Sequence, residues 1–147
     1  MIPIVGLLLM PADSSAQNRR RAQVKDSLIL SCIFLQAKDI TPKESRADGQ
    51  KELKLVLASN SDTVVKACMD GVISKVQRDQ DGKWEVVFYH QDYWFWLTGI
   101  TTVAVKPNQK VKAGQAIGYN ETGEPVELLV YDFETPVDPK KYMRCAE

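Results

Sequence analysis

Short runs of apolar or alternating residues, separated by turn residues, dominate the chain after residue 50. Successive side chains of a strand point to opposite faces of a sheet, so a repeat of two residues indicates a β-strand. The pattern predicts strands over 53–58, 63–68, 72–78, 84–90, 93–97, 101–105, 115–119 and 126–133. Many short strands with no helical repeat among them are typical of a sandwich or a barrel.

The alternation also predicts which side chains share a face of a strand. In 84–90 one face would carry Trp84, Val86, Phe88 and His90, and the other Glu85, Val87 and Tyr89. In 72–78 strict alternation groups Val72 with Ser74 and Val76. The Asp70-Gly71 pair ahead of this strand is a hairpin-type turn signal.

The first fifty residues follow a different pattern. An apolar stretch, Ile2–Met10, is broken by Pro11 and followed by small residues, which is typical of a signal peptide and its cleavage site. A buried N-terminal strand is the alternative. We therefore expect a signal peptide over 1–17, an irregular or short-helical extension with a loop over 18–50, and one β domain over 51–147. The sequence predicts a secreted or periplasmic protein with no membrane span, since no stretch reaches the ~20 apolar residues of a spanning helix.

Composition limits the kinds of partner that the protein is expected to bind. The 147 residues include 19 lysines and arginines and 19 aspartates and glutamates, so the net charge is zero. A neutral chain has no general attraction for nucleic acid or for anionic membranes, and we expect neither as a partner. The three cysteines, Cys32, Cys68 and Cys145, lack the close pairs of a zinc motif. Export would permit one disulfide, and the sequence leaves its pairing open.

The chemistry for catalysis is sparse. His90 is the only histidine, whereas a zinc hydrolase usually needs two or three histidine ligands and a group that handles protons. No serine lies in a nucleophile-elbow motif, and no glycine-rich phosphate loop or dinucleotide fingerprint is present. The sequence therefore predicts no catalytic residue, no metal ligand and no cofactor. A carrier domain is also disfavoured, because no Met-Lys pair is available for modification.

Seven aromatic residues lie within 84–96: Trp84, Phe88, Tyr89, Tyr93, Trp94, Phe95 and Trp96. Such residues commonly fill a core through cross-strand contacts. However, both faces of 93–97 carry large apolar side chains, so one face must be covered by the domain or by a ligand. We take His90, Tyr93, Trp94 and Trp96 as a candidate binding surface.

Four segments, in order along the chain, resemble the core of the M23 peptidase family, the lysostaphin-like or LytM-like domains. They are Val65–Ile73, Gly82–His90, Val105–Gly118 and Val137–Tyr142, and the last contains the terminal Val-Asp-Pro of that family. The resemblance implies a barrel-sandwich hybrid fold, that is, a small β-sandwich of short antiparallel strands. It covers about half of the chain.

The resemblance fails at the active site. The family binds zinc with a histidine and an aspartate ahead of the first turn, where this chain has Glu52 and Val56. Gly99 stands where the family has a catalytic histidine, and the family's His-x-His strand aligns with Leu128-Leu129-Val130. Valine cannot bind zinc. We take Glu52, Val56, Gly99, Leu128 and Val130 as the positions of a vestigial site.

The resemblance therefore implies a pseudo-peptidase: a non-catalytic binding or regulatory module of the bacterial cell envelope. Its expected partner is peptidoglycan or an envelope protein. The alternative is an active metalloendopeptidase that cuts peptidoglycan with an unconventional site, which stoichiometric zinc in the purified protein would favour.

Overall fold

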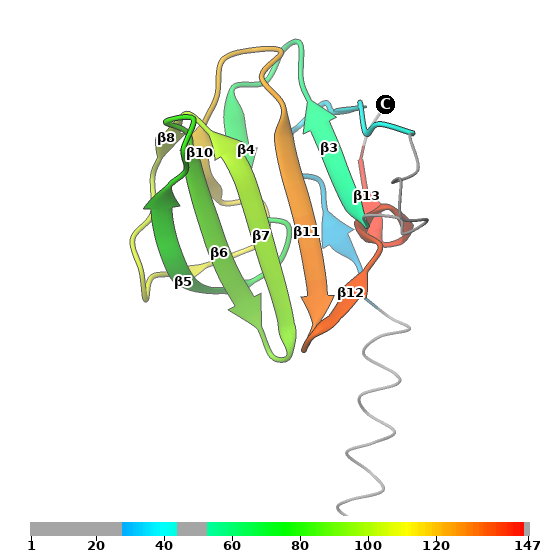
Figure 1. The fold of residues 1–147 in the computed structure, drawn as a ribbon, viewed down its shortest axis with the longest axis vertical. Coiled ribbons are helices and arrows are strands. Elements are labelled where there is room, and N and C mark those ends of the chain that lie inside the picture. The colour runs from blue at the N-terminus through cyan, green and yellow to red at the C-terminus, as the bar shows by residue number, and fades with distance from the viewer. Residues whose placement is uncertain (1–27, 44–52, 146–147) are drawn as a thin grey trace, which may run out of the picture.

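A computed structural model describes residues 28–43 and 53–145. Within these residues the chain is almost entirely β-structure, and the expected all-β fold is confirmed (Figure 1). The elements are β1 Leu30–Ser31, β2 Lys38–Asp39, β3 Lys54–Ala58, β4 Val64–Lys66, β5 Gly71–Arg78, β6 Trp84–His90, β7 Tyr93–Ile100, β8 Thr102–Val103, β9 Lys110–Val111, β10 Ala116–Tyr119, β11 Val126–Asp132, β12 Thr135–Val137, the 3₁₀ turn η1 Pro139–Lys141 and β13 Met143–Arg144. No described helix is long and apolar enough to cross a bilayer.

One large sheet organises the molecule. Its strands follow the order β2-β3-β11-β7-β6-β5-β9, and β12 pairs with the far end of β11. All of these pairs are antiparallel. In Figure 1 this sheet faces the viewer, and the smaller sheet β4-β10-β8 lies behind it. The main core fills the space behind the large sheet, which leaves the sheet's front face to form a surface.

The N-terminal extension is part of this core. Leu28, Leu30, Ile33 and Phe34 are buried and belong to the same hydrophobic cluster as the strands. The segment 28–43 contains two short strands and no helix, so the irregular form of the expected extension is the one that occurs here. The expected signal peptide over 1–17 lies outside the described residues.

A β-bulge overturns the predicted faces of β5. The pairing of β5 with β6 shifts register between Ile73 and Lys75. Ile73 is fully buried and Val76 packs against the same core, although strict alternation would place them on opposite faces. The grouping of Val72 with Ser74 and Val76 was therefore wrong, because one extra residue in a strand reverses the alternation beyond it. The predicted faces of β6 are confirmed, with Val86 and Phe88 in the core.

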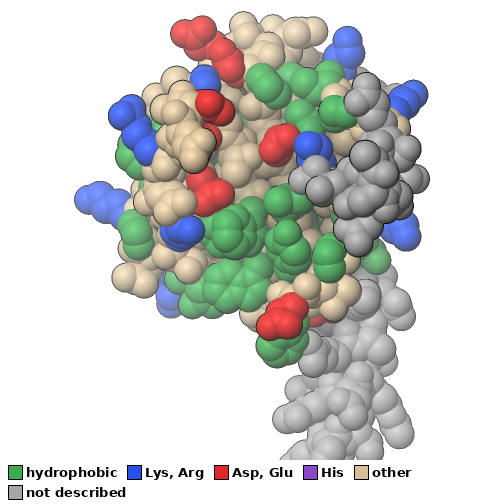
Figure 2. Space-filling model, in the orientation of Figure 1, with side chains coloured by type: hydrophobic (Ala, Val, Ile, Leu, Met, Phe, Trp, Pro, Cys, Tyr) green, Lys and Arg blue, Asp and Glu red, His purple; other side chains and the backbone are tan. Residues whose placement is uncertain are grey.

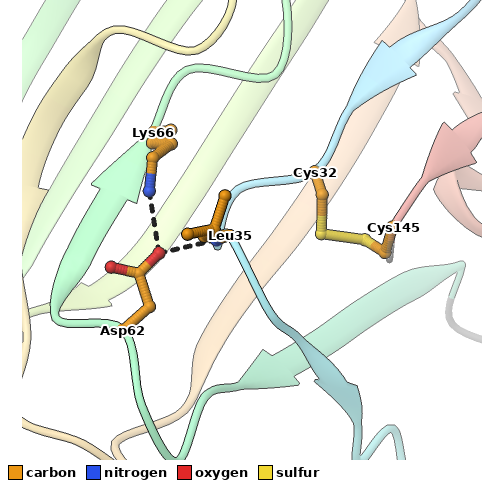
Figure 3. The surroundings of a disulfide bond; sticks show 5 residues. All are labelled: Cys32, Leu35, Asp62, Lys66 and Cys145. Carbon is orange, nitrogen blue, oxygen red and sulfur yellow. Dashed lines mark hydrogen bonds and ion pairs between the residues drawn. A yellow bond between two sulfur atoms is a disulfide. The ribbon is translucent and has the colours of Figure 1, made fainter. Parts of the chain in front are cut away.

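Two links attach the N-terminal segment to distant parts of the chain (Figure 3). Cys32 forms a disulfide with Cys145, 113 residues away, and Cys68 is buried as a free thiol. The Leu35 N–H donates to Asp62 Oδ2 at 2.6 Å, and Lys66 Nζ lies 2.7 Å from the same oxygen. Thus a disulfide and a hydrogen bond to an ion-paired carboxylate attach the N-terminal segment to the rest of the fold.

Candidate functional site

The register of the large sheet places its front-face side chains in three rows across the strands. Residues directly opposite each other in an antiparallel pair lie on the same face. The rows are Gln77-Glu85-Thr98-Glu127-Val56, Lys75-Val87-Trp96-Leu129-Lys54 and Tyr89-Trp94-Tyr131. Alternate residues of the same strands, such as Phe95, Leu97 and Leu128, belong to the core cluster instead. We call the surface formed by these rows the front face.

Val56 lies at one end of the polar row and is buried, yet it does not belong to the main core cluster. Its partner across the strands is Glu127. Lys54 Nζ lies 3.3 Å from Glu127 Oε1, and Thr98 Oγ1 donates to Glu127 Oε2 at 3.4 Å. At this place, then, the front face carries a hydrocarbon side chain next to a carboxylate that is already paired with an ammonium.

The other vestigial positions lie elsewhere. Leu128 and Val130 are buried in the core, on the face opposite to Val56, because they alternate with Glu127 and Leu129 along β11. The structure therefore does not bring Leu128 or Val130 together with Val56; it brings Glu127 and Leu129 to that face instead. Glu52 lies outside the described residues.

Gly99 has a backbone reason for lacking a side chain. Its φ is +93°, and a Cβ atom there would lie 2.7 Å from the carbonyl oxygen of Pro125. Its own carbonyl accepts a hydrogen bond from Asn120 Nδ2 at 2.9 Å. Gly99 lies within β7, where the register with β6 shifts, and allows β7 to pack closely against the residue that precedes β11. The adjacent Thr98 supplies the side chain that reaches the front face.

A groove of about 550 Å³ runs along the lower part of the front face. It is lined by Glu85, Trp94, Trp96, Leu129, Tyr131, Phe133 and Glu134, and we call it the aromatic groove. Figure 2 shows apolar side chains gathered over β6, β7 and β11 in this region. Phe133 is 57% exposed, which is unusual for a large apolar side chain. The groove thus exposes a contiguous apolar surface of the kind that marks binding sites.

Two ion pairs flank Trp96 in the middle row. On one side Lys75 Nζ lies 3.8 Å from Glu85 Oε2 and 5.4 Å from the centre of the Trp96 ring. On the other side lie Lys54 and Glu127. Below them the rings of Tyr89 and Trp94 are in contact, with centres 5.0 Å apart. These contacts hold the aromatic side chains in place, so the groove is largely preformed.

The residues of the predicted binding surface do not all lie on the front face of the large sheet. Trp94 and Trp96 line the groove, whereas Tyr93 is only 4% exposed and belongs to the core cluster. The prediction that Tyr93 belongs to the binding surface was therefore wrong. Tyr93 alternates with Trp94 along β7, so it faces the core when Trp94 faces the groove. His90 pairs with Tyr93 at the end of β6 and does not line the groove. Three residues of the groove were not predicted from the sequence: Tyr131, Phe133 and Glu134. The alternation of 126–133 could have indicated that Tyr131 lies on the surface of the sheet.

Comparison with protein-family models shows to which family the chain is related. The model of peptidase family M23 matches residues 53–139, which is more than half of the chain. The chain belongs to peptidase family M23. No curated protein sequence matches it significantly. The expected resemblance is thus confirmed at the level of the family.

Solved structures show the same M23 fold. Csd3 of Helicobacter pylori has a TM-score of 0.65 and 18% identity over 81% of this chain. The match spans 36% of Csd3, so this chain corresponds to about a third of that protein. A chain of the SpoIIIAH–SpoIIQ complex has a TM-score of 0.64 and 16% identity over 78% of this chain and 99% of its own length. Lysostaphin of Staphylococcus simulans has a TM-score of 0.58 and 21% identity, covering 74% of this chain and 50% of lysostaphin.

The residues on the front face do not suit the zinc ion of an M23 peptidase. Val56 offers no donor atom, and Glu127 is paired with Lys54, whose positive charge disfavours a nearby cation. Within 28–43 and 53–145, no three histidine, cysteine, aspartate or glutamate side chains are grouped as metal ligands would be. These residues therefore do not fit a catalytic zinc ion.

Proposed function

We propose that this chain is a non-catalytic M23 domain of the bacterial cell envelope, secreted or periplasmic, that binds peptidoglycan or an envelope protein through the aromatic groove. The observation that carries the proposal is that Val56, at a position where the resemblance predicts a zinc ligand, pairs across the strands with Glu127, which is itself paired with Lys54. Without a bound metal, no water is activated near neutral pH by the mechanism of this family.

The groove supports the binding half of the proposal. Trp94, Trp96 and Tyr131 present half-buried rings that are held by neighbouring contacts, and a rigid aromatic surface loses little entropy when a ligand binds. One of the similar structures is a complex of two proteins, SpoIIIAH and SpoIIQ. By analogy, this similarity supports an envelope protein as a partner alongside peptidoglycan.

Retention on purified peptidoglycan and on envelope extracts tests the binding surface. Trp94→Ala should abolish retention, because it removes one wall of the groove. Tyr119→Ala is the matched control, because Tyr119 is 43% exposed on β10, outside the groove. Equal retention of wild type and Trp94→Ala would contradict the proposed surface.

Metal analysis and a peptidoglycan-clearing assay test the absence of catalysis. We expect less than stoichiometric zinc and no clearing, with or without added zinc. Stoichiometric zinc together with clearing that a chelator abolishes would instead establish an active metalloendopeptidase with an unconventional site.

A further inference from the structure

The chemistry of the aromatic groove is specific enough to suggest the kind of ligand it takes. This inference rests on the proposed function, because it assigns a ligand to the same groove. The lining combines rings and apolar side chains with two carboxylates, Glu85 and Glu134, and contains no lysine or arginine. The face of an aromatic ring is electrostatically negative, so rings and carboxylates together favour a cation.

The two carboxylates differ in their pairing. Glu85 lies 3.8 Å from Lys75 and accepts a hydrogen bond from Gln77 Nε2 at 3.2 Å. Glu134 is exposed in the turn after β11 and forms no ion pair with another described residue. It stands next to Phe133, which is 57% exposed. The groove therefore has one uncompensated negative charge beside an apolar surface.

A lysine of this chain that lies beside the groove already binds to two of its lining residues in this way. The Lys75 ammonium lies 5.4 Å from the centre of the Trp96 ring and pairs with the Glu85 carboxylate. Trp94 and Glu134 offer the same two groups, a ring and a carboxylate, and no cation from residues 28–43 or 53–145 pairs with them. A lysine or arginine from a partner would complete the second set.

The negative charge of Glu134 favours some kinds of ligand over others. A neutral sugar would stack on Trp94 but would leave the Glu134 carboxylate uncompensated as water is displaced around it. An anionic polymer would be repelled by that carboxylate. We propose that the ligand is an extended peptide segment of an envelope protein, whose lysine or arginine side chain contacts the Trp94 ring and the Glu134 carboxylate.

A selection from a random peptide display library against the full chain tests this inference. We expect the selected peptides to be enriched in lysine and arginine, and Trp94→Ala to lose them. One selected peptide, made synthetically, is then titrated by tryptophan fluorescence. Glu134→Gln should weaken its Kd by about tenfold, because a charge-assisted contact is lost. Its salt dependence should also fall.

Glu121→Gln is the matched control, because it removes the same charge from an exposed loop at the opposite end of β11. Glu134 lies on an exposed turn, so its substitution tests the site even where Trp94→Ala fails to fold. Selected peptides without lysine or arginine, or an unchanged Kd in Glu134→Gln, would overturn the inference. Retention on peptidoglycan together with failure of the peptides would overturn the inference alone, whereas failure of peptides, peptidoglycan and envelope extracts would overturn the proposed function as well.

Discussion

At position 99 the backbone itself forbids a side chain. A φ of +93° is strained for any residue other than glycine, and the Pro125 carbonyl oxygen occupies the space where a Cβ would lie. The absence of a side chain at Gly99 is therefore explained by close packing of neighbouring strands. Thr98, its neighbour, contributes to the front face by holding Glu127.

Gly99→Ala should lower the free energy of unfolding by about 2 kcal/mol or more, because strain and a backbone clash add together. Gly82→Ala is the control: its φ is +80° and no atom lies within 4 Å of the added Cβ. It should cost only about 1 kcal/mol, the cost of the left-handed conformation alone. Equal losses for the two variants in urea denaturation would show that the contact with Pro125 is unimportant.

Asp62 joins the N-terminal segment to β4 through a carboxylate. Burial by itself raises the pKa of Asp62. The hydrogen bonds from Lys66, Leu35 and Val64, with the charge of Lys66, outweigh this effect and lower the pKa from 3.8 to about 2. The folded state therefore holds the ionised form more firmly than the unfolded state does.

This pKa predicts a loss of stability in acid. The contribution of Asp62 is fully present above the unfolded pKa of about 4 and is lost as the pH falls toward 2, because the unfolded state then binds more protons. Asp62→Asn should be less stable than wild type by about 2 kcal/mol at pH 6, and the difference should shrink at pH 2. Asp81→Asn, in an exposed turn, is the control. A difference that does not depend on pH would contradict this account.

Among the elements, β11 decides what the front face contains. It runs through the middle of the large sheet between β3 and β7, and alternate residues face the core and the groove. Leu129 is half-buried in the groove, and Val130 is 1% exposed in the core. Two residues that are adjacent along β11 therefore lie in different environments, one at the surface and one in the core.

Histidine substitutions along β11 test this assignment. Val130→His should cost about 3 kcal/mol or more, because it places a polar ring without a designed partner in the core. Leu129→His should cost about 1 kcal/mol, because the groove leaves the ring in contact with water. Free energies of unfolding in urea measure both. A larger loss for Leu129→His than for Val130→His would reverse the assignment of the faces.

For the whole molecule, the Cys32–Cys145 disulfide joins segments near both ends of the described chain. Leu30 pairs with Met143 in the parallel ladder of β1 and β13 beside it. A link across 113 residues strongly restricts the unfolded chain. The disulfide therefore stabilises the whole fold, including the sheet that carries the groove.

The double variant Cys32→Ser/Cys145→Ser should lose about 2–5 kcal/mol of stability. Wild type treated with reductant should approach the same value. Burial raises the pKa of the Cys68 thiol to about 12, so alkylation of the folded, reduced protein should label Cys32 and Cys145 and spare Cys68. Denaturant curves and mass spectrometry measure these effects. Labelling of Cys68 before unfolding, or no change in stability on reduction, would contradict this role.

The sequence by itself determined the all-β fold, the range Trp84–His90 of one strand and membership of the M23 family, because these depend on local periodicity and short motifs. It also determined that one histidine is present, which limits metal chemistry whatever the fold. Only the tertiary structure decided the cysteine pairing, the faces of Tyr93 and Val130, and the groove. The physical reason is that alternation separates two sets of side chains without saying which set meets the core, and a single bulge in β5 exchanges them.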